Sequence, residues 1–149
     1  MADEPLALAL GALARKERSV AELRCWLAGR GVDPSGVERV VEQLLDGGAL
    51  DDERFAERFA EDKREISGWG RERIATALEA RGVGRGEIEA ALAAEDREEE
   101  LERAVGLVLT AVGEPADDRA RGRAFGLLVR RGFGAEAAYE AVRRAGRAA

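Results

Sequence analysis

The sequence of 149 residues contains no histidine, one cysteine and three prolines. The absence of histidine removes the most common general base and the most common metal ligand of proteins. Because Cys25 is the only cysteine, we expect no internal disulfide, no cysteine–histidine nucleophilic pair and a reducing compartment. The glycines are scattered rather than clustered after a strand, which argues against the common phosphate-binding loops. We therefore expect neither an enzyme with catalytic residues nor a bound cofactor or metal.

Long apolar runs and a basic N-terminus are also missing. The longest apolar run, Leu6–Ala14, is far shorter than the roughly 20 residues that a membrane-spanning helix needs. Asp3 and Glu4 stand where a secretory signal would need positive charge. These features predict a cytoplasmic protein without a membrane partner.

Residues that favour β-strands are few. Aromatic residues make up 5% of the chain, and no segment alternates polar and apolar positions. Hydrophobic residues make up 46% and charged residues 36%, enough of both for a soluble helical protein. The composition predicts an all-α fold.

A short turn is repeated three times along the chain. An arginine, a glycine and an apolar residue follow one another at residues 30–32, 81–83 and 131–133, so the glycines recur at intervals of 51 and 50 residues. Apolar residues stand four and eight positions before each glycine and six and ten positions after it, which is typical of two helices joined by a bend. Glycine suits this position because it ends a helix in the left-handed conformation, and the next residue then packs back on the helix. The repeat predicts three copies of a helical hairpin.

Cap and stop residues divide each copy into three helices. The predicted caps are Ser19 with Glu22, Asp33 before Pro34, Asp51, Gly84, and either Asp117 or Asp118. We therefore predict three tandem three-helix, helix-turn-helix-like repeats, with boundaries at 1–50, 51–94 and 95–149. Helical spacing also places four large residues in the core: Leu10, Leu45, Ile66 and Tyr139. The acidic segment 95–102 is interpreted as the solvated start of a helix.

The net charge of −6 argues against simple nucleic-acid binding, but the charge is unevenly distributed. Residues 119–149 carry eight arginines and two glutamates, whereas the rest of the chain is acidic. The second helices of the first two predicted helix-turn-helix motifs, 34–46 and 85–95, are acidic and would be repelled by phosphate. In the third repeat we expect contacts with DNA phosphate or an acidic surface from six arginines: Arg119, Arg121, Arg123, Arg130, Arg143 and Arg144. That these arginines are simply exposed helix formers stays open as an alternative.

Both tryptophans are interpreted from their neighbours. Trp26 falls beside an apolar stripe and is predicted to be partly buried. Trp69 stands between Gly68 and Gly70, where it is either a wedge between repeats or an exposed anchor for a partner.

The middle of the chain resembles the RecX family, bacterial modulators of the RecA recombinase. The residues that carry the resemblance are Leu50–Ala56, Gly68-Trp69-Gly70, Arg73-Ile74 and Leu78 before Gly82, together with Glu17-Arg18-Ser19 and Glu22-Leu23 in the first repeat. The resemblance extends from about Leu6 to Arg144 and implies that the three repeats form an elongated, curved body. It also implies a non-enzymatic inhibitor that binds the RecA–single-stranded DNA filament and limits its growth, ATP hydrolysis, strand exchange and co-protease activity. Such a protein would act in homologous recombination, DNA repair and the SOS response.

The arginines of the repeated turns and of the middle repeat are the candidate contacts with the filament. The glycine and the apolar residue of each repeated turn have an architectural role, which leaves the turn arginine free for recognition. We predict that the RecA filament is bound by Arg30, Arg54, Arg71, Arg73, Arg81 and Arg131 of a monomer, with weak direct DNA contact. Helix-end arginines also stabilise the last carbonyl groups, so a structural role for the turn arginines is an equal alternative. Two other functions stay open: a DNA-binding helix-turn-helix protein without a recombinase partner, and a general helical adaptor.

Overall fold

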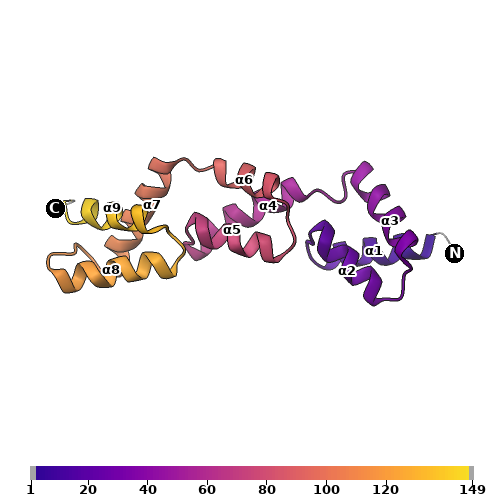
Figure 1. The fold of residues 1–149 in the computed structure, drawn as a ribbon, viewed down its shortest axis with the longest axis horizontal. Helices are drawn as coiled ribbons and strands as arrows, with labels where there is room; N and C mark the ends of the chain where they lie inside the picture. Colours follow the sequence, from indigo (N-terminus) through magenta and orange to yellow (C-terminus); the bar gives the residue numbers. More distant parts are fainter. Residues whose placement is uncertain (1–2, 148–149) are drawn as a thin grey trace. The chain divides into compact units, whose positions relative to one another are not determined.

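The computed structural model describes residues 3–147, and within this range all regular secondary structure is helical (Figure 1). The described residues form nine α-helices and one π-helical segment, η1, which confirms the predicted all-α fold. Their bounds are α1 (Asp3–Arg15), α2 (Val20–Gly29), α3 (Pro34–Asp46), α4 (Asp52–Asp62), η1 (Lys63–Ser67), α5 (Arg71–Ala80), α6 (Arg85–Ala93), α7 (Arg97–Ala111), α8 (Asp118–Arg130) and α9 (Ala135–Ala145). Among these described helices, none combines the length and the apolar character that crossing a bilayer requires.

The helices belong to two compact units. The first comprises the described residues up to Arg58 together with Leu78–Ala91, and the second comprises Phe59–Ala77 together with the described residues from Leu92 onward. The middle helices α4, α5 and α6 therefore each contribute one part to the first unit and the other part to the second.

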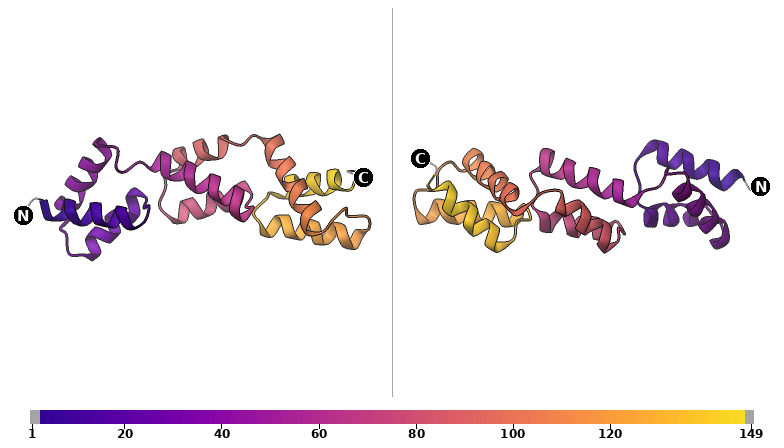
Figure 2. Two further views of the ribbon diagram at one scale, coloured as in Figure 1. Left: turned by 180° about the vertical axis from the view of Figure 1, so that it is seen from behind. Right: turned by 90° about the horizontal axis from the view of Figure 1, so that it is seen from above.

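The core of the first unit lies between α1, α2 and α3, which contact one another in every pair (Figures 1 and 2). Small residues of α1, Ala9 and Ala12, are fully buried there and allow the larger side chains of α2 and α3 to approach. These larger side chains include Leu23, Leu27, Val37, Val40, Val41 and Leu44, and Leu50 joins them after α3. Burial of this apolar surface drives the packing of helices that would be marginal alone.

The core of the second unit lies between α7, α8 and α9, which also contact one another in every pair. The α9 face is built of small residues, with Ala138, Ala141 and Ala145 fully buried. They pack against larger residues of α7 and α8 and against the turn residue Phe133: Leu101, Val108 and Leu128.

Most predicted helix caps are confirmed. The Ser19 hydroxyl accepts from the Glu22 N–H, and the Glu22 carboxylate accepts from the Ser19 N–H, which completes the capping box. Asp51 and Asp117 accept the expected backbone N–H groups of α4 and α8. Asp33 stands at the start of α3 but makes no side-chain cap, because its carboxylate accepts the Ser35 hydroxyl instead.

The prediction that Ile66 belongs to the core is wrong, since its side chain is 82% exposed. The cause is η1, which continues α4 as a π-helix through residues 63–67. A π-helix bonds each residue to the fifth rather than the fourth neighbour, so it inserts one extra residue in the turn. One residue corresponds to about 100° around a helix, enough to turn Ile66 from the buried face to solvent.

Leu10, Leu45 and Tyr139 were also predicted to be buried, and the structure shows all three exposed, Tyr139 by 66%. Each directly follows a buried residue in its helix and therefore points about 100° away from it. The buried stripes of α1, α3 and α9 are narrower than the apolar sequence pattern, because adjacent helices cover only one side.

Candidate partner-binding surfaces

The three repeated turns have the predicted backbone. Gly31, Gly82 and Gly132 have φ angles of 86°, 78° and 96°, in the left-handed region that favours glycine. The N–H of the following apolar residue then donates to a leucine carbonyl of the helix, at 3.2 Å (Val32 to Leu27), 3.1 Å (Val83 to Leu78) and 3.0 Å (Phe133 to Leu128). The glycine and the apolar residue are thus architectural, as the sequence predicted.

Within the first unit, the second turn docks on the start of α2. The Ser19 hydroxyl, which is fully buried, donates to the Arg81 carbonyl at 2.6 Å. Gly82 lies directly against Ala21, and a Cβ atom added to Gly82 would overlap the Ala21 Cβ. The C-terminal end of one helix thereby meets the N-terminal end of another, an arrangement that aligns their dipoles favourably.

Side chains complete this contact between the second turn and the start of α2, which is here called the first docking contact. The Arg81 guanidinium donates from Nε and Nη2 to the two carboxylate oxygens of Glu22 at 2.9 and 3.0 Å. It also lies 4.7 Å from the centroid of the Phe55 ring. Arg81 therefore already has partners inside the chain, and its predicted contact with a recombinase stays a prediction.

Two carboxylates of the first docking contact have shifted pKa values. Burial raises the pKa of Glu22, but hydrogen bonds from the Arg81 side chain and from its own cap outweigh this effect, so the net pKa is lowered. Asp52 accepts the Val20 N–H at 2.9 Å, yet burial and the nearby Glu87 raise its pKa. The first docking contact therefore favours the ionised form of Glu22 and disfavours the ionised form of Asp52.

Within the second unit, the third turn docks on the start of α5 mainly through backbone atoms. The Gly70 N–H donates to the Arg131 carbonyl at 2.8 Å, and the Glu72 N–H donates to the Gly132 carbonyl at 3.0 Å. A Cβ atom at Gly70 would lie 2.5 Å from the Phe133 nitrogen, so only glycine allows this approach. The Arg131 guanidinium donates to the Ser67 carbonyl at 2.8 Å and closes the contact from the other side.

The contact between the third turn and the start of α5 is here called the second docking contact. Trp69 lies beside it and is half-buried. The Arg73 guanidinium lies 4.1 Å from its ring centroid and the Lys63 ammonium 4.7 Å, both within the range of cation–π attraction. Phe59 meets the indole edge-on at 6.3 Å. These three partners belong to the same predicted repeat as Trp69, so the wedge between repeats and the anchor for a partner both stay predictions. Arg73 also donates to the Arg130 carbonyl at 3.3 Å.

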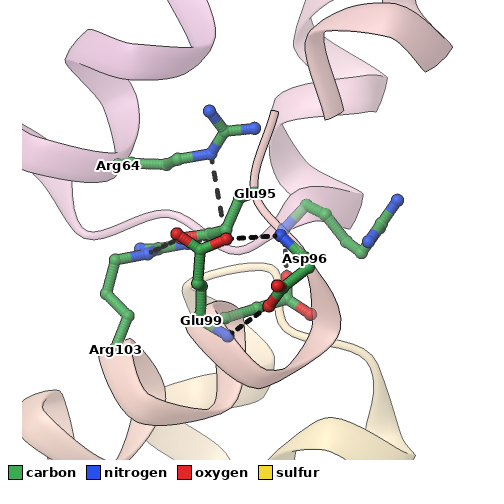
Figure 3. A network of polar contacts seen from close by, with 7 residues as sticks. Arg64, Glu95, Asp96, Glu99 and Arg103 are labelled. Carbon is green, nitrogen blue, oxygen red and sulfur yellow. Dashed lines mark hydrogen bonds and ion pairs between the residues drawn. The ribbon is translucent and has the colours of Figure 1, made fainter. Parts of the chain in front are cut away.

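A polar network connects η1 to the start of α7 (Figure 3). Glu95 binds Arg103 through two hydrogen bonds of 2.7 and 3.0 Å and lies 3.6 Å from Arg64. Asp96 and Glu99 form a reciprocal capping box at the start of α7. The side chain of Glu95 is only 12% exposed. A buried carboxylate needs such paired guanidinium groups to offset the loss of water.

The interpretation of residues 95–102 as a solvated segment is therefore wrong in part. Besides Glu95, Glu100 is only 4% exposed, and its carboxylate accepts the Arg71 N–H at 3.0 Å. This bond caps the start of α5 from another helix, a role that the sequence pattern does not reveal. Glu98, Glu99 and Glu102 are exposed, as predicted.

The remaining arginines that are predicted to bind the partner differ in the contacts that their side chains make within the chain. Arg54 is exposed, and its Nη2 donates to the Gly48 carbonyl, in the turn after α3, at 3.1 Å. The side chain of Arg71 is exposed at the first position of α5. Arg30 is exposed and lies 4.5 Å from the centroid of the Trp26 ring, which is half-buried as predicted.

The structure divides the six arginines predicted to contact phosphate into two groups. Arg121, Arg143 and Arg144 form ion pairs with acidic residues of the same unit, among them Glu98 and Glu140. These pairs lower the pKa of Glu140 and raise that of Arg144. The other three have no ion pair among the described residues and are exposed on α8: Arg119, Arg123 and Arg130. Their spacing of four and seven residues places them on one face of that helix, here called the α8 arginine stripe.

Sequence reasoning missed the acidic partners of the arginines. Glu22 was assigned only to its capping box, because the box explains its position completely. A glutamate at the equivalent position of each repeat would have indicated that Glu22 also pairs with a turn arginine, but only if the repeats used the same side chains. They do not, since Arg73 stands where Glu22 would recur.

The fold and the docking turns define a class of protein, an all-helical protein of tandem three-helix domains. Comparison with known proteins specifies the class further. The profile of the first three-helix domain of RecX matches residues 6–44, and that of the second matches residues 51–92. The regulatory protein RecX of Halorhodospira halophila is 44% identical over 131 residues, which cover 86% of this chain and 80% of the relative. That of Mycolicibacterium vanbaalenii is 33% identical over 149 residues and covers 94% and 81% of the two chains.

Solved structures share the fold. The crystal structure of RecX from Lactobacillus salivarius has a TM-score of 0.87 at 17% identity, over 97% of this chain and 96% of the other. A second crystal structure of a regulatory protein RecX has a TM-score of 0.78 at 21% identity, over 96% and 73%. The chain belongs to the RecX family of regulatory proteins.

Proposed function

We propose that the chain is a non-enzymatic inhibitor of the RecA recombinase, which binds the RecA–single-stranded DNA filament. In this role it limits filament growth, ATP hydrolysis, strand exchange and co-protease activity, and works as a monomer in the cytoplasm. The observation that carries the proposal is membership of the RecX family, through domain matches over residues 6–44 and 51–92. The three successive repeats, with proposed boundaries at 1–50, 51–94 and 95–149, offer several contacts on one chain, whose affinities multiply.

The arginines that form no ion pair with another described residue are the strongest candidates for this contact. Arg30, Arg71 and Arg73 are exposed, and their guanidinium groups make no ion pair among the described residues. Arg54, Arg81 and Arg131 bind groups of their own unit, so loss of their side chains would disturb the fold as well as recognition. A loss of binding in Arg71→Ala is therefore the cleaner indication of recognition, because the Arg73 side chain also donates to the Arg130 carbonyl and lies over the Trp69 ring of its own unit.

The α8 arginine stripe supports a weak direct contact with DNA. Three guanidinium groups on one helix face, without neutralising carboxylates, form a surface that phosphate attracts. The net charge of −6 opposes the approach of DNA to the rest of the chain. We therefore expect the stripe to act once the chain is already held on the filament.

The test is a RecA ATPase assay that depends on single-stranded DNA. We expect the chain, added well below the RecA concentration, to reduce ATP hydrolysis and to shorten the filaments seen by electron microscopy. Unchanged hydrolysis together with unchanged filament length would overturn the proposal.

The second candidate function, a DNA-binding protein without a recombinase partner, is favoured by the α8 arginine stripe alone. It predicts tight binding to bare duplex DNA with a steep loss of affinity as salt rises. The variant Arg119→Ala/Arg123→Ala/Arg130→Ala separates the two functions. Under the proposed function it retains filament binding with a smaller dependence on salt, whereas under the alternative it loses binding altogether. Arg121→Ala, which removes an arginine paired with Asp118, is the matched control.

A further inference from the structure

The first of the three repeated turns lacks the neighbour that the other two have. Carbonyl groups of the second and third turns accept hydrogen bonds from the start of a preceding helix. The carbonyl groups of Arg30 and Gly31 accept no hydrogen bond among the described residues. A Cβ atom added to Gly31 would meet no atom within 4 Å, whereas one added to Gly82 or Gly132 would overlap the docked helix. The first turn thus has the same backbone as the other two but contacts no helix start among the described residues.

A recess of about 550 Å³ lies beside this turn. It is lined by α1, by the turn and by α3, with Leu8, Val32 and Val40 as apolar residues and Glu4, Asp33 and Arg39 as charged ones. Arg30 stands at its edge with the guanidinium stacked on Trp26 and without an ion pair among the described residues. At the second turn, the corresponding Arg81 is stacked on Phe55 and also binds Glu22. The acidic partner is the element that the first turn is missing.

We propose that the Arg30-Gly31-Val32 turn receives the N-terminal end of a helix in the recombinase protomer. The two docking contacts inside the chain specify the chemistry of this ligand. It is a helix whose first turn offers a hydroxyl or backbone N–H to the free carbonyl groups, as Ser19 and Gly70 do. A small residue lies against Gly31, and a carboxylate in the same turn pairs with Arg30, as Ala21 and Glu22 do at the second turn. This inference rests on the proposed function for the identity of the partner.

A second copy of the chain is a poor ligand for the first turn. The equivalent helix start in the third repeat belongs to α8, which begins with Asp117 and Asp118 and then presents Arg119, Arg121 and Arg123. The N-cap residue and the first residue of that helix are acidic, but the three arginines on its first two turns carry the same charge as Arg30. The starts of α2 and α5 are already covered by turns of the same chain. The starts of α2, α5 and α8 are therefore poor ligands for the first turn, and the proposed ligand is a helix start of another protein.

The test uses Gly31→Asn in the full chain. Asparagine tolerates the left-handed conformation better than most residues, and nothing in the chain obstructs its Cβ atom at position 31. Its side chain would occupy the open space beside Gly31 into which the proposed helix start would pack. Gly113→Asn is the matched control, since Gly113 has nearly the same φ, 85°, and equally open surroundings. We expect Gly31→Asn to weaken binding to a RecA–single-stranded DNA filament by about tenfold and Gly113→Asn to bind like the wild type.

A cross-linking experiment identifies the ligand directly. A photo-reactive benzoyl-phenylalanine replaces Gly29, which is exposed beside Arg30 and has open surroundings, and the adduct on the filament is mapped by mass spectrometry. We expect adducts on the first turn of a RecA helix that contains a carboxylate. Equal filament binding by the two asparagine variants, adducts on DNA, or adducts on a second copy of the chain would each overturn the inference and leave the proposed function intact. Failure of the wild type to bind the filament would overturn the proposed function, and with it this ligand.

Discussion

The second and third repeated turns show how one backbone motif docks through two kinds of chemistry. At the second turn, side chains make the contact: the Ser19 hydroxyl and the Glu22–Arg81 ion pair. At the third turn, two backbone N–H groups bind two backbone carbonyls, and glycine at position 70 makes the approach possible. The geometry is retained while the side chains change, because helix ends always carry unpaired N–H and carbonyl groups. Side chains then tune a contact that the backbone already favours.

The comparison predicts that the third turn is the less tolerant of added volume. Gly132→Ala must adopt φ near 96° and also displace Arg73, whose nitrogen would lie 2.7 Å from the new Cβ atom. We expect a loss of about 3 kcal/mol or more in the free energy of unfolding. Gly31→Ala carries only the conformational cost, about 1 kcal/mol, because its surroundings are open. Urea unfolding measures both, and equal losses would show that docking does not constrain the third turn.

The second turn is predicted to depend on the buried hydroxyl of Ser19. Ser19→Ala leaves the Arg81 carbonyl and the Glu22 N–H without their partner, so we expect a loss of about 2 kcal/mol. Ser35→Ala is the control, because this exposed hydroxyl binds the Asp33 side chain alone among the described residues, and its loss should cost less than about 0.5 kcal/mol. If the two serines prove equivalent in thermal or urea unfolding, the hydroxyl does not hold the second turn.

A double-mutant cycle isolates the Glu22–Arg81 ion pair. Both side chains are roughly 30% exposed, which screens the pair, so we expect a coupling energy of about 1 kcal/mol from Glu22→Ala, Arg81→Ala and the double variant. The cycle for Glu98 and Arg144, which is more exposed, should give a smaller coupling. A coupling near zero for Glu22 and Arg81 would indicate that the guanidinium is available for a partner, as the sequence analysis predicted.

The same contact predicts a dependence of stability on pH. Glu22 has a lowered pKa in the folded chain, so its contribution is present above the unfolded value of 4.5 and is lost as the pH falls through the folded pKa. Asp52 has a raised pKa, so its ionisation reduces stability as the pH rises through the folded value, above 3.8. In unfolding measured from about pH 3 to about pH 6, Glu22→Gln should lose less stability on acidification than the wild type. Asp52→Asn should lose more, and parallel curves for all three proteins would contradict both assignments.

The smallest effect is expected away from both docking contacts. Ile66 is apolar but exposed, so Ile66→Ser should change the free energy of unfolding by less than about 0.5 kcal/mol. Ile74→Ser, at a fully buried position of α5, is the contrasting variant and should be strongly destabilising. A large loss for Ile66→Ser would mean that η1 does not turn this residue to solvent.

Local patterns in the sequence were sufficient for the helices, for most of their caps and for the repeated turns, although Asp33 makes no side-chain cap. Serine and aspartate at helix starts and glycine at helix ends act on backbone groups within four residues, so their effect is independent of the rest of the chain. Local patterns did not predict burial correctly where the helix register or the neighbouring helices decide which side chains are covered. Ile66 follows helical spacing, but the π-helical turn before it breaks the register. Tyr139 and Leu45 lie beside buried stripes whose width depends on the neighbouring helices.

The arginines of the repeated turns also show which features follow from local sequence and which follow from tertiary contacts. The sequence by itself determined that Arg30, Arg81 and Arg131 end helices beside a left-handed glycine. Only the tertiary structure decided that Arg81 binds Glu22, 59 residues away, that Arg131 binds the Ser67 carbonyl, and that Arg30 makes no ion pair among the described residues. The physical reason is that an arginine at a helix end is satisfied equally well by water, a carboxylate or a carbonyl. Which of these it meets depends on segments brought together by the burial of other residues.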